Sequence, residues 1–383
     1  MDAAALVRDA DKAAAARDFT QAVSLLEKAA ALSPADGALW IRIAAIRRGI
    51  GDASAALDAI HKALAIAPRD FTALLMRASL LQRLERPEAG EAWGHALAQK
   101  PERDLPQQLG PVVAEAEQRY GEWQAKKEAA LKARMADAER SASDEERKRI
   151  DRFRTNAVRR TRAYHSQPTD FQFPELAERE FHPRRLFPWL EQLESATEAV
   201  TAELRAVMAE ERAELVPYVQ FEDHVPMDQW RPLNRNPDWT AIHLIQHGKL
   251  VEANARHCPN TMALLRQLPQ PGVPGASPNA MFSLLAPKTV IPPHFGISNT
   301  RLVCHLPLIV PEGCWFRVGA ETRPWKAGEA FVFDDTMEHE AANPSDELRV
   351  VLICDVWHPD LSPAERDSVA ALISAGESAR HGL

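Results

Sequence analysis

The chain has 383 residues, of which 45% are hydrophobic and 26% are charged, and its formal net charge is −8. This length allows two or more domains with ordinary hydrophobic cores, and the composition excludes wholesale disorder. The acidic balance argues against a nucleic-acid partner, and the basic run Arg159–Arg162 is interpreted as a solvated helix face.

Nothing in the sequence predicts export or membrane insertion. The N-terminus lacks a basic segment followed by an apolar run, and no stretch of about 20 apolar residues occurs. The four cysteines are widely spaced and form no Cys-x-x-Cys motif, which favours reduced and buried thiols. We therefore expect a cytoplasmic protein without a membrane partner.

The first hundred residues contain an internal repeat. Three prolines recur at intervals of 34 and 33 residues: Pro34, Pro68 and Pro101. An alanine lies twelve positions before each of them: Ala22, Ala56 and Ala89. Small residues at a fixed phase let paired helices approach closely, and the proline ends one helical unit. The pattern predicts tetratricopeptide-like helical repeats over residues 1–104, with partial or capping units at the ends.

The next segment, residues 105–167, is highly charged and rich in residues that favour helices. It predicts one or two exposed connecting helices, stabilised by ion pairs between residues four positions apart.

Residues 168–383 have the pattern of a β domain. A helical period runs through His182–Met208, and short apolar segments bounded by Pro, Gly, Asn or Asp follow it. The predicted strands are Phe282–Leu285, Arg301–Val310, Cys314–Val318, Ala330–Phe333 and Arg349–Val356. This spacing predicts a double-stranded β-helix, or jelly roll, with flanking helices. The whole chain is thus expected to be a multidomain α+β protein.

Three residues of the β domain suggest a metal site with an anion-binding partner. His294 lies in a Pro-His-Phe-Gly sequence, His339 lies in Glu-His-Glu, and Arg349 follows ten residues later. A neutral imidazole is a good ligand for Fe(II), and a guanidinium can hold a dicarboxylate through two hydrogen bonds. The three residues together favour an oxygenase over a hydrolase.

The expected third ligand is absent from the sequence. Many Fe(II) oxygenases have a carboxylate two residues after the first histidine, where this chain has Gly296. The residues alone leave three explanations: no metal binds, water replaces the carboxylate, or a halide takes its place, as in a halogenase. Asp334 and Asp335 are interpreted as a strand-closing turn in preference to metal ligands.

Seven ordered motifs are more specific than the histidine pair. They are Ser283–Pro287, Pro293–Leu302, His305–Leu308, Pro311–Cys314, Phe333–Asp335, Glu338–Glu340 and Asp355–Pro359. In this order they resemble the aspartyl/asparaginyl β-hydroxylase family, whose members depend on Fe(II) and 2-oxoglutarate. The resemblance extends over residues 181–366, and animal members of the family also have helical repeats before the oxygenase domain.

The resemblance implies a role for each site residue. His294 and His339 would bind Fe(II), and the family has glycine where this chain has Gly296. Arg349 and Ser283 would bind the distal carboxylate of 2-oxoglutarate, and His305 would meet the carboxylate next to the keto group. No catalytic residue is expected beyond these ligands of the metal and the cosubstrate.

One position departs from the family pattern. Animal protein hydroxylases have a second arginine two residues before the position of His305, where this chain has Val303. In the family that arginine helps to bind acidic groups near the iron, so its loss weakens the prediction of an aspartyl substrate. Arg301 could partly replace it and is counted with the cofactor-binding residues.

The expected function is a dioxygenase that uses Fe(II), 2-oxoglutarate and O2 to hydroxylate the β-carbon of Asp or Asn residues. The repeats would hold the peptide or protein substrate. The alternatives are a hydroxylase of a small, carrier-bound or lipid substrate, with repeats used only for assembly, and a non-catalytic interaction protein. Trp230, Trp239 and Trp315 could line a substrate cleft, although core packing is the simpler interpretation.

Overall fold

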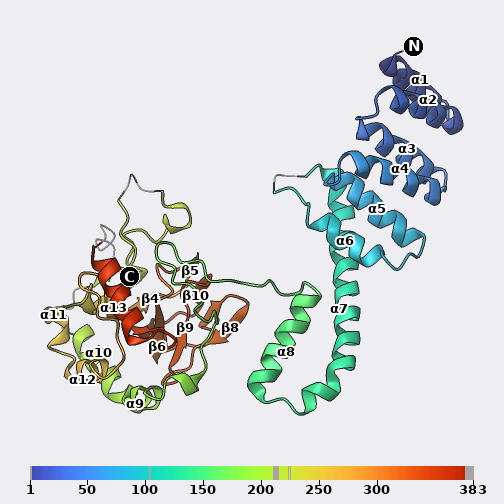
Figure 1. Ribbon diagram of the computed structural model, residues 1–383. Coiled ribbons are helices and arrows are strands. Elements are labelled where there is room, and N and C mark those ends of the chain that lie inside the picture. The colour runs from blue at the N-terminus through green and yellow to red at the C-terminus, as the bar shows by residue number, and fades with distance from the viewer. Residues whose placement is uncertain (1, 103–104, 210–214, 223, 225, 376–383) are drawn as a thin grey trace. The chain divides into compact units, whose positions relative to one another are not determined.

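The computed structural model describes residues 2–102, 105–209, 215–222, 224 and 226–375 (Figure 1). The chain divides into two compact units, Met1–Thr161 and Arg162–Leu383. The helices of the predicted connector therefore belong to the first unit, together with the repeats. Among the described helices, none is both long enough and apolar enough to cross a membrane.

The first unit is a stack of antiparallel helix pairs. Its helices are α1 (Ala3–Ala15), α2 (Phe19–Leu32), α3 (Gly37–Gly49), α4 (Ala53–Ile66), α5 (Phe71–Arg83), α6 (Ala89–Leu97), η1 (Gln107–Leu109), α7 (Gly110–Arg140) and α8 (Asp144–Ala157). Aspartate side chains accept a hydrogen bond from the first turn of each helix from α1 to α5. The predicted period is confirmed because α2, α4 and α6 each end shortly before one of the three prolines.

The repeat alanines have the role that their spacing predicts. Ala22, Ala56 and Ala89 are all buried, and they allow each second helix to pack closely against its neighbours. Two glycines of α6 have the same function toward α7. A Cβ atom at Gly94 would lie 2.4 Å from the Tyr120 ring, so the close packing of α6 and α7 requires glycine there.

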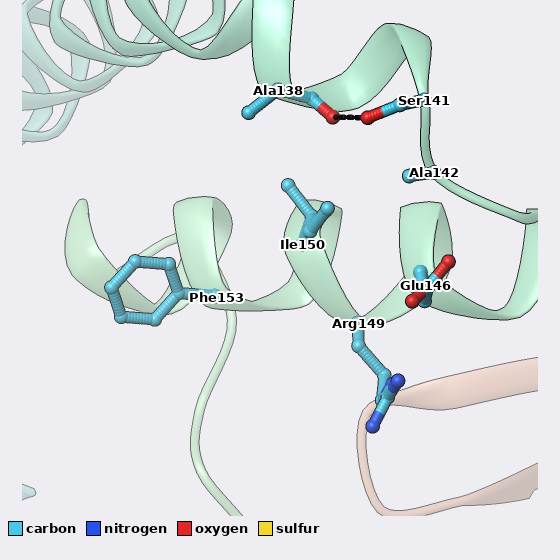
Figure 2. Close-up of a pocket in the computed structure, with 7 residues that line it drawn as sticks. All are labelled: Ala138, Ser141, Ala142, Glu146, Arg149, Ile150 and Phe153. Carbon is cyan, nitrogen blue, oxygen red and sulfur yellow. Dashed lines mark hydrogen bonds between the residues drawn. The ribbon is translucent and has the colours of Figure 1, made fainter.

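The connector helices α7 and α8 are mostly exposed, as the sequence predicts, and bury only a few side chains. The first turns of α7 bury Val113 and Ala116 against the repeats, because they continue the helical stack. Arg154 of α8 is buried and pairs with Glu139 of α7 at 2.8 Å. A surface hollow of about 470 Å³ opens between the two helices, next to Ile150 and Phe153 (Figure 2).

The second unit, called the β unit below, contains two antiparallel sheets. The larger sheet has the order β1-β2-β4-β11-β6-β9, with β3 beside β2, and the smaller has the order β5-β10-β7-β8. The strands are β1 (Val216–Pro217), β2 (Trp239–Gln246), β3 (Lys249–Leu250), β4 (Ala280–Leu285), β5 (Thr289–His294), β6 (Arg301–Ile309), β7 (Trp315–Val318), β8 (Glu321–Pro324), β9 (Phe331–Phe333), β10 (His339–Asn343) and β11 (Arg349–Trp357).

Helices and short helical turns accompany the sheets. They are η2 (Arg184–Leu186), α9 (Leu190–Ser195), α10 (Thr197–Ala209), η3 (Asp228–Trp230), α11 (Glu252–Ala255), α12 (Pro259–Leu265) and α13 (Pro363–Ala375). One hydrophobic core lies between the larger sheet and helices α9, α10 and α12. A second core lies between the two sheets and contains mostly aromatic and branched side chains. This arrangement agrees with the predicted jelly roll with flanking helices.

The strand predictions are confirmed where the apolar runs are long. β4, β6, β7, β9 and β11 coincide with the five predicted segments within two residues at each end. The sequence did not predict β2, β5, β8 or β10, nor the two-residue strands β1 and β3. β5 contains Pro292 and Pro293, which remove backbone donors, and β5 is accordingly an edge strand of its sheet.

Candidate functional site

The two predicted metal ligands lie on neighbouring strands of the smaller sheet. His294 is the last residue of β5 and His339 is the first residue of β10, and the antiparallel register places them opposite each other. Their ring centroids are 3.9 Å apart. The register shifts between His339 and Ala341, and irregularities of this kind commonly redirect side chains beside active sites.

Both imidazoles are neutral, and each has a backbone carbonyl near its Nδ1 atom. His294 Nδ1 lies 2.8 Å from the carbonyl oxygen of Pro292, and His339 Nδ1 lies 3.0 Å from that of Met337. If each Nδ1 donates to its carbonyl, each Nε2 keeps a free lone pair for a metal. Burial lowers the pKa of His294 to about 3 and that of His339 to about 4, so both rings are neutral near pH 7.

The carboxylate of Asp335 fills the space beside Gly296, where many Fe(II) oxygenases have their own carboxylate ligand. A Cβ atom at Gly296 would lie 2.2 Å from Oδ2 of Asp335. A carboxylate side chain at position 296 would therefore collide with Asp335. Among the described residues, no third His, Cys, Asp or Glu joins the histidines in a group that could hold a metal. The donor set fits a metal held by two histidines, with the other positions open to small ligands.

The two aspartates before His339 have different roles. Asp334 Oδ1 accepts hydrogen bonds from the backbone N–H of Thr336 at 2.9 Å and from its hydroxyl at 2.5 Å. This confirms the predicted turn, and burial raises the pKa of Asp334 to about 7. Asp335 has a different partner, because its Oδ2 lies 3.0 Å from Nη2 of Arg301.

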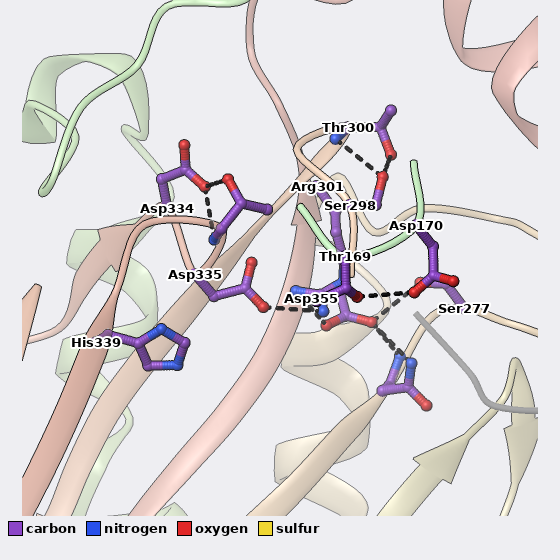
Figure 3. A network of polar contacts seen from close by, with 12 residues as sticks. Thr169, Asp170, Ser277, Ser298, Thr300, Arg301, Asp334, Asp335, His339 and Asp355 are labelled. Atoms are coloured by element: carbon purple, nitrogen blue, oxygen red, sulfur yellow. Dashed lines mark hydrogen bonds and ion pairs between the residues drawn. The ribbon is translucent and has the colours of Figure 1, made fainter. Parts of the chain in front are cut away.

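Arg301 is surrounded by carboxylates. Besides Asp335, it faces Asp355, whose Oδ1 lies 3.7 Å from Nη1 of Arg301 (Figure 3). Asp355 in turn accepts hydrogen bonds from the Ser277 hydroxyl and from the backbone and side chain of Asn279. All three charged groups are buried. The positive charge of Arg301 is therefore already paired, and its predicted contact with a cosubstrate stays a prediction.

Arg349 presents the opposite situation. It is 2% exposed, and its Nη1 donates to the Ser283 carbonyl at 3.2 Å and lies 3.4 Å from the Ser283 hydroxyl. The guanidinium lies 4.6 Å from the centre of the Trp325 ring. In the part of the chain that the structure describes, no carboxylate pairs with Arg349 and its Nε has no partner. Burial without a counter-charge lowers the pKa of Arg349 to about 9.

His305 lies in an aromatic pocket, close to Arg349 and to His339. It is buried among Phe316, Phe331, Phe333 and Trp325, with ring centroids 4.8–6.2 Å away. Burial, followed by the nearness of Arg349 and His339, holds the pKa of His305 well below its usual range. Its Nδ1 has no hydrogen-bond partner among the described residues. A neutral, buried and unpaired ring nitrogen is a ready donor or acceptor for a bound ligand.

Aromatic side chains complete the surroundings of His294. The ring centroids of Trp230 and Trp239 lie 5.0 and 6.3 Å from that of His294. Tyr218 stacks on Trp239 at 3.9 Å. From the sequence, either tryptophan could line a substrate cleft or pack in the core. The structure places both of them beside His294. Trp325 and Tyr218 were missed, and no sequence signal distinguishes them from other aromatic residues.

Comparisons with known proteins agree with the region that contains this site. Residues 194–359 match the family model for aspartyl/asparaginyl beta-hydroxylase. A human aspartate beta-hydroxylase domain-containing protein 2 is 37% identical over 38% of this chain and 41% of its own length. A human aspartyl/asparaginyl beta-hydroxylase is 37% identical over 37% of this chain and 18% of its own length.

One bacterial relative is named for a lipid rather than for aspartate or asparagine. An ornithine lipid ester-linked acyl 2-hydroxylase of Rhizobium tropici is 35% identical over 46% of this chain and 60% of its own length. The alignments thus span less than two thirds of each of these three relatives. A solved Arabidopsis OM64 TPR domain matches 31% of this chain over 94% of its length, with 21% identity and a TM-score of 0.27.

The family match includes every residue of the candidate site. Ser283, His294, His305, His339 and Arg349 all lie between residues 194 and 359. Residues 194–359 of this chain, which contain the whole candidate site, are therefore similar in sequence to the aspartyl/asparaginyl beta-hydroxylase family.

Proposed function

We propose that the chain is an Fe(II)- and 2-oxoglutarate-dependent dioxygenase that hydroxylates an unactivated carbon. The observation that supports this proposal most strongly is Arg349. It is a buried cation without a carboxylate partner among the described residues, and it lies in the same β unit as two neutral histidines that face each other. Burying an unpaired cation is costly, so such a group is best explained as one that an anionic ligand completes.

The histidine pair has the right chemistry for the metal. His294 and His339 would hold Fe(II) through Nε2, because a backbone carbonyl lies within hydrogen-bond distance of each Nδ1. Together with bound 2-oxoglutarate, the metal supplies the O2 activation that hydroxylation requires. Of the two oxygen atoms of O2, one enters the product and the other enters succinate, while 2-oxoglutarate loses CO2.

The remaining residues would bind and orient the cosubstrate. Arg349 and Ser283 would donate hydrogen bonds to its distal carboxylate, which offsets the loss of water around both charges. His305 would donate to the carboxylate next to the keto group. The aromatic side chains around His294 and His305 would exclude bulk water, which strengthens these polar contacts.

For the substrate, we propose the β-carbon of an Asp or Asn residue in a peptide or protein. The support is the family match of residues 194–359 and the presence of helical repeats that could hold a chain. We also propose that the chain acts in the cytoplasm, and the support is that its four cysteines are free and buried, as is usual for proteins of a reducing compartment.

A second candidate is an acyl chain or another uncharged substrate, and a specific observation favours it. Val303 replaces the family arginine, and the charge of Arg301, two residues away, is already paired with Asp335 and Asp355. Arg301 is therefore a poor substitute for that arginine in binding a substrate carboxylate. The relative from Rhizobium tropici carries the name of an acyl hydroxylase.

The experiment that tests the reaction is succinate formation from 2-oxoglutarate with Fe(II), ascorbate and O2. We expect turnover by the wild type and none by Arg349→Ala. Arg366→Ala is a matched control, because Arg366 also lies over a tryptophan ring, Trp357, but outside the site. Equal turnover in the wild type and Arg349→Ala would contradict the assignment of the cosubstrate pocket.

The substrate is tested in parallel reactions with an Asn peptide, an Asp peptide and an ornithine lipid. The expected product gains the mass of one oxygen atom. An Asn or Asp product supports the first candidate, and a hydroxylated acyl chain supports the second. If the peptide is the substrate, removal of residues 1–161 should raise the KM for the peptide and leave the KM for the cosubstrate unchanged.

A further inference from the structure

We propose that residues 166–173, called the strap below, are a positioning segment for the metal, with Ser166 as a positioning residue. The strap joins the loop that follows His294 to the loop that precedes His339, and so fixes how the two imidazoles face each other. The inference rests on the proposed function, since it assumes that these histidines hold Fe(II). The strap lies outside the family match, which begins at residue 194.

The strand ladder gives the two histidines limited support. His294 is the last residue of β5 and His339 is the first residue of β10, so both lie at an end of the ladder. The register also shifts between His339 and Ala341. Ends of secondary structure open at a lower free energy than its middle, so contacts beyond the ladder are what can fix both rings.

The backbone of the strap supplies contacts to both loops. The N–H of Gln167 donates to the carbonyl of Thr336 at 2.7 Å, in the loop that leads to the second histidine. The N–H of Thr169 donates to the carbonyl of Gly296 at 3.1 Å, in the loop that leaves the first histidine. A single short segment thus bridges the two loops next to the predicted metal ligands.

Ser166 adds a side-chain contact whose direction can be assigned. Its hydroxyl lies 2.6 Å from the hydroxyl of Thr336, and both residues are buried. A threonine hydroxyl has one hydrogen, and Thr336 donates it to Oδ1 of Asp334 at 2.5 Å. Ser166 is therefore the donor to Thr336. The chain of hydrogen bonds from Ser166 through Thr336 to Asp334 holds the turn that leads to His339.

Asn299 makes the corresponding contact from the other loop. Its Oδ1 accepts from the N–H of Phe173 at 2.7 Å, and its Nδ2 donates to the carbonyl of Phe173 at 2.9 Å. Phe171 and Phe173 also pack against a hydrophobic cluster that contains Trp357. Because this end of the strap is anchored in a core of its own, the strap can hold the loop after His294 in place.

The test is the dissociation constant of Co(II) as a substitute for Fe(II), followed by visible absorption of the full-length chain without O2. If the rings face each other only part of the time, the apparent dissociation constant rises by the inverse of that fraction. We expect Ser166→Ala to bind Co(II) about fivefold more weakly and Thr336→Val about tenfold more weakly. In the Thr336→Val background, Ser166→Ala should cause no further loss beyond about twofold.

Asn299→Asp tests the other attachment of the strap. The variant keeps the shape of the side chain but replaces the donor to the Phe173 carbonyl with an oxygen, so an attraction becomes a repulsion. We expect it to bind Co(II) at least about fivefold more weakly. It also tests the strap without any change to the turn before His339.

Ser345→Ala serves as the matched control for Ser166→Ala. The Ser345 hydroxyl donates to Oδ1 of Asn343 at 2.6 Å, beside the end of β10 that is opposite to His339. The control loses a hydrogen bond of the same length in the same unit, and we expect it to bind Co(II) as the wild type does. Urea unfolding of both variants shows whether a loss of stability alone weakens metal binding.

Three results would overturn the inference while leaving the proposed function intact. The first is wild-type affinity for Co(II) in Ser166→Ala or in Asn299→Asp. The second is an equal loss of affinity in Ser345→Ala, which would indicate a general loss of stability. The third is an undiminished effect of Ser166→Ala in the Thr336→Val background. If His294→Ala binds Co(II) as the wild type does, the proposed function fails and the inference fails with it.

Discussion

Two buried arginines of the β unit differ in how their charge is balanced. Arg301 on β6 has two buried carboxylates beside it, Asp335 and Asp355. Arg349 on β11 has none among the described residues, and its contacts are a serine and a tryptophan ring. Both side chains are almost inaccessible to solvent. The same residue type is thus part of a closed network in one place and incomplete in the other.

The difference separates structure from ligand binding. A buried cation between carboxylates is a network whose partners depend on each other, so removal of one member leaves the others unpaired. A buried cation without a carboxylate gains most when an external anion arrives. Residue type and burial would not distinguish the two arginines, whereas their partners do.

The largest effect on stability should come from Arg301→Met. It leaves Asp335 and Asp355 buried without a cation, so we expect the free energy of unfolding of this unit to fall by about 3–5 kcal/mol. Urea unfolding followed by near-ultraviolet circular dichroism measures the change. Arg323→Met removes a more exposed arginine of β8 and should cost less than about 1 kcal/mol. Similar losses in the two variants would remove the contrast between the arginines.

Gly296→Ala should disturb the same network from its other side. The added Cβ would lie 2.2 Å from Asp335 Oδ2, so Asp335 must move away from Arg301. We expect a loss of about 1–3 kcal/mol in the free energy of unfolding. Gly272→Ala is the control, because nothing lies within 4 Å of its added Cβ. If both variants are equally stable, Asp335 is not held against Gly296.

A third buried basic group responds to burial by staying neutral. Neither ring nitrogen of His182 has a partner among the described residues, and burial lowers its pKa to about 3. The unfolded chain binds a proton near the ordinary histidine pKa of about 6.5, whereas the folded chain does not. The contribution of neutral His182 to the free energy of unfolding is therefore present above about pH 6.5 and is lost as the pH falls toward 3.

The variant His182→Phe tests this sign. Between about pH 7.5 and about pH 5, the wild type should lose about 1–2 kcal/mol more than the variant in the free energy of unfolding. Urea titrations at the two pH values provide the comparison. An equal pH dependence of both proteins would show that His182 takes up its proton in the folded state too.

The smallest effect on stability should come from Arg349→Met. No charged partner is left unpaired, and an apolar side chain avoids the desolvation of a charge, so the unliganded variant should lie within about 1 kcal/mol of the wild type or above it. Thermal unfolding with and without 2-oxoglutarate and Mn(II) gives both quantities. The ligand should raise the Tm of the wild type only. A loss above about 2 kcal/mol would show that Arg349 has a structural partner.

The sequence predicts the parts of the fold that depend on local period. The proline and alanine spacing predicts the repeats, and long apolar runs predict β4, β6 and β11. β5 was missed although it carries His294, because adjacent prolines are rare in strands.

The site could be predicted only in part, because local sequence patterns do not record contacts between distant residues. Ordered motifs indicated both histidines and Arg349, but partners come from distant positions that no local pattern records. Asp335 is 34 residues from Arg301, and Trp239 is 44 residues from Ser283. The pairing of Arg301 and the hydrogen bond from Trp239 to Ser283 therefore emerge only when strands from different parts of the chain are placed side by side.

The central claim is that the histidine pair and Arg349 form one site for a metal and a dicarboxylate. Its most direct test is an anaerobic titration of the full-length chain, first with Fe(II) and then with 2-oxoglutarate. We predict one Fe(II) per wild-type chain and 2-oxoglutarate binding that depends on the metal. Arg349→Met should keep the metal and lose 2-oxoglutarate, and His294→Ala should lose both. A wild-type chain that binds no Fe(II), or an Arg349→Met variant with wild-type affinity for 2-oxoglutarate, would contradict the account.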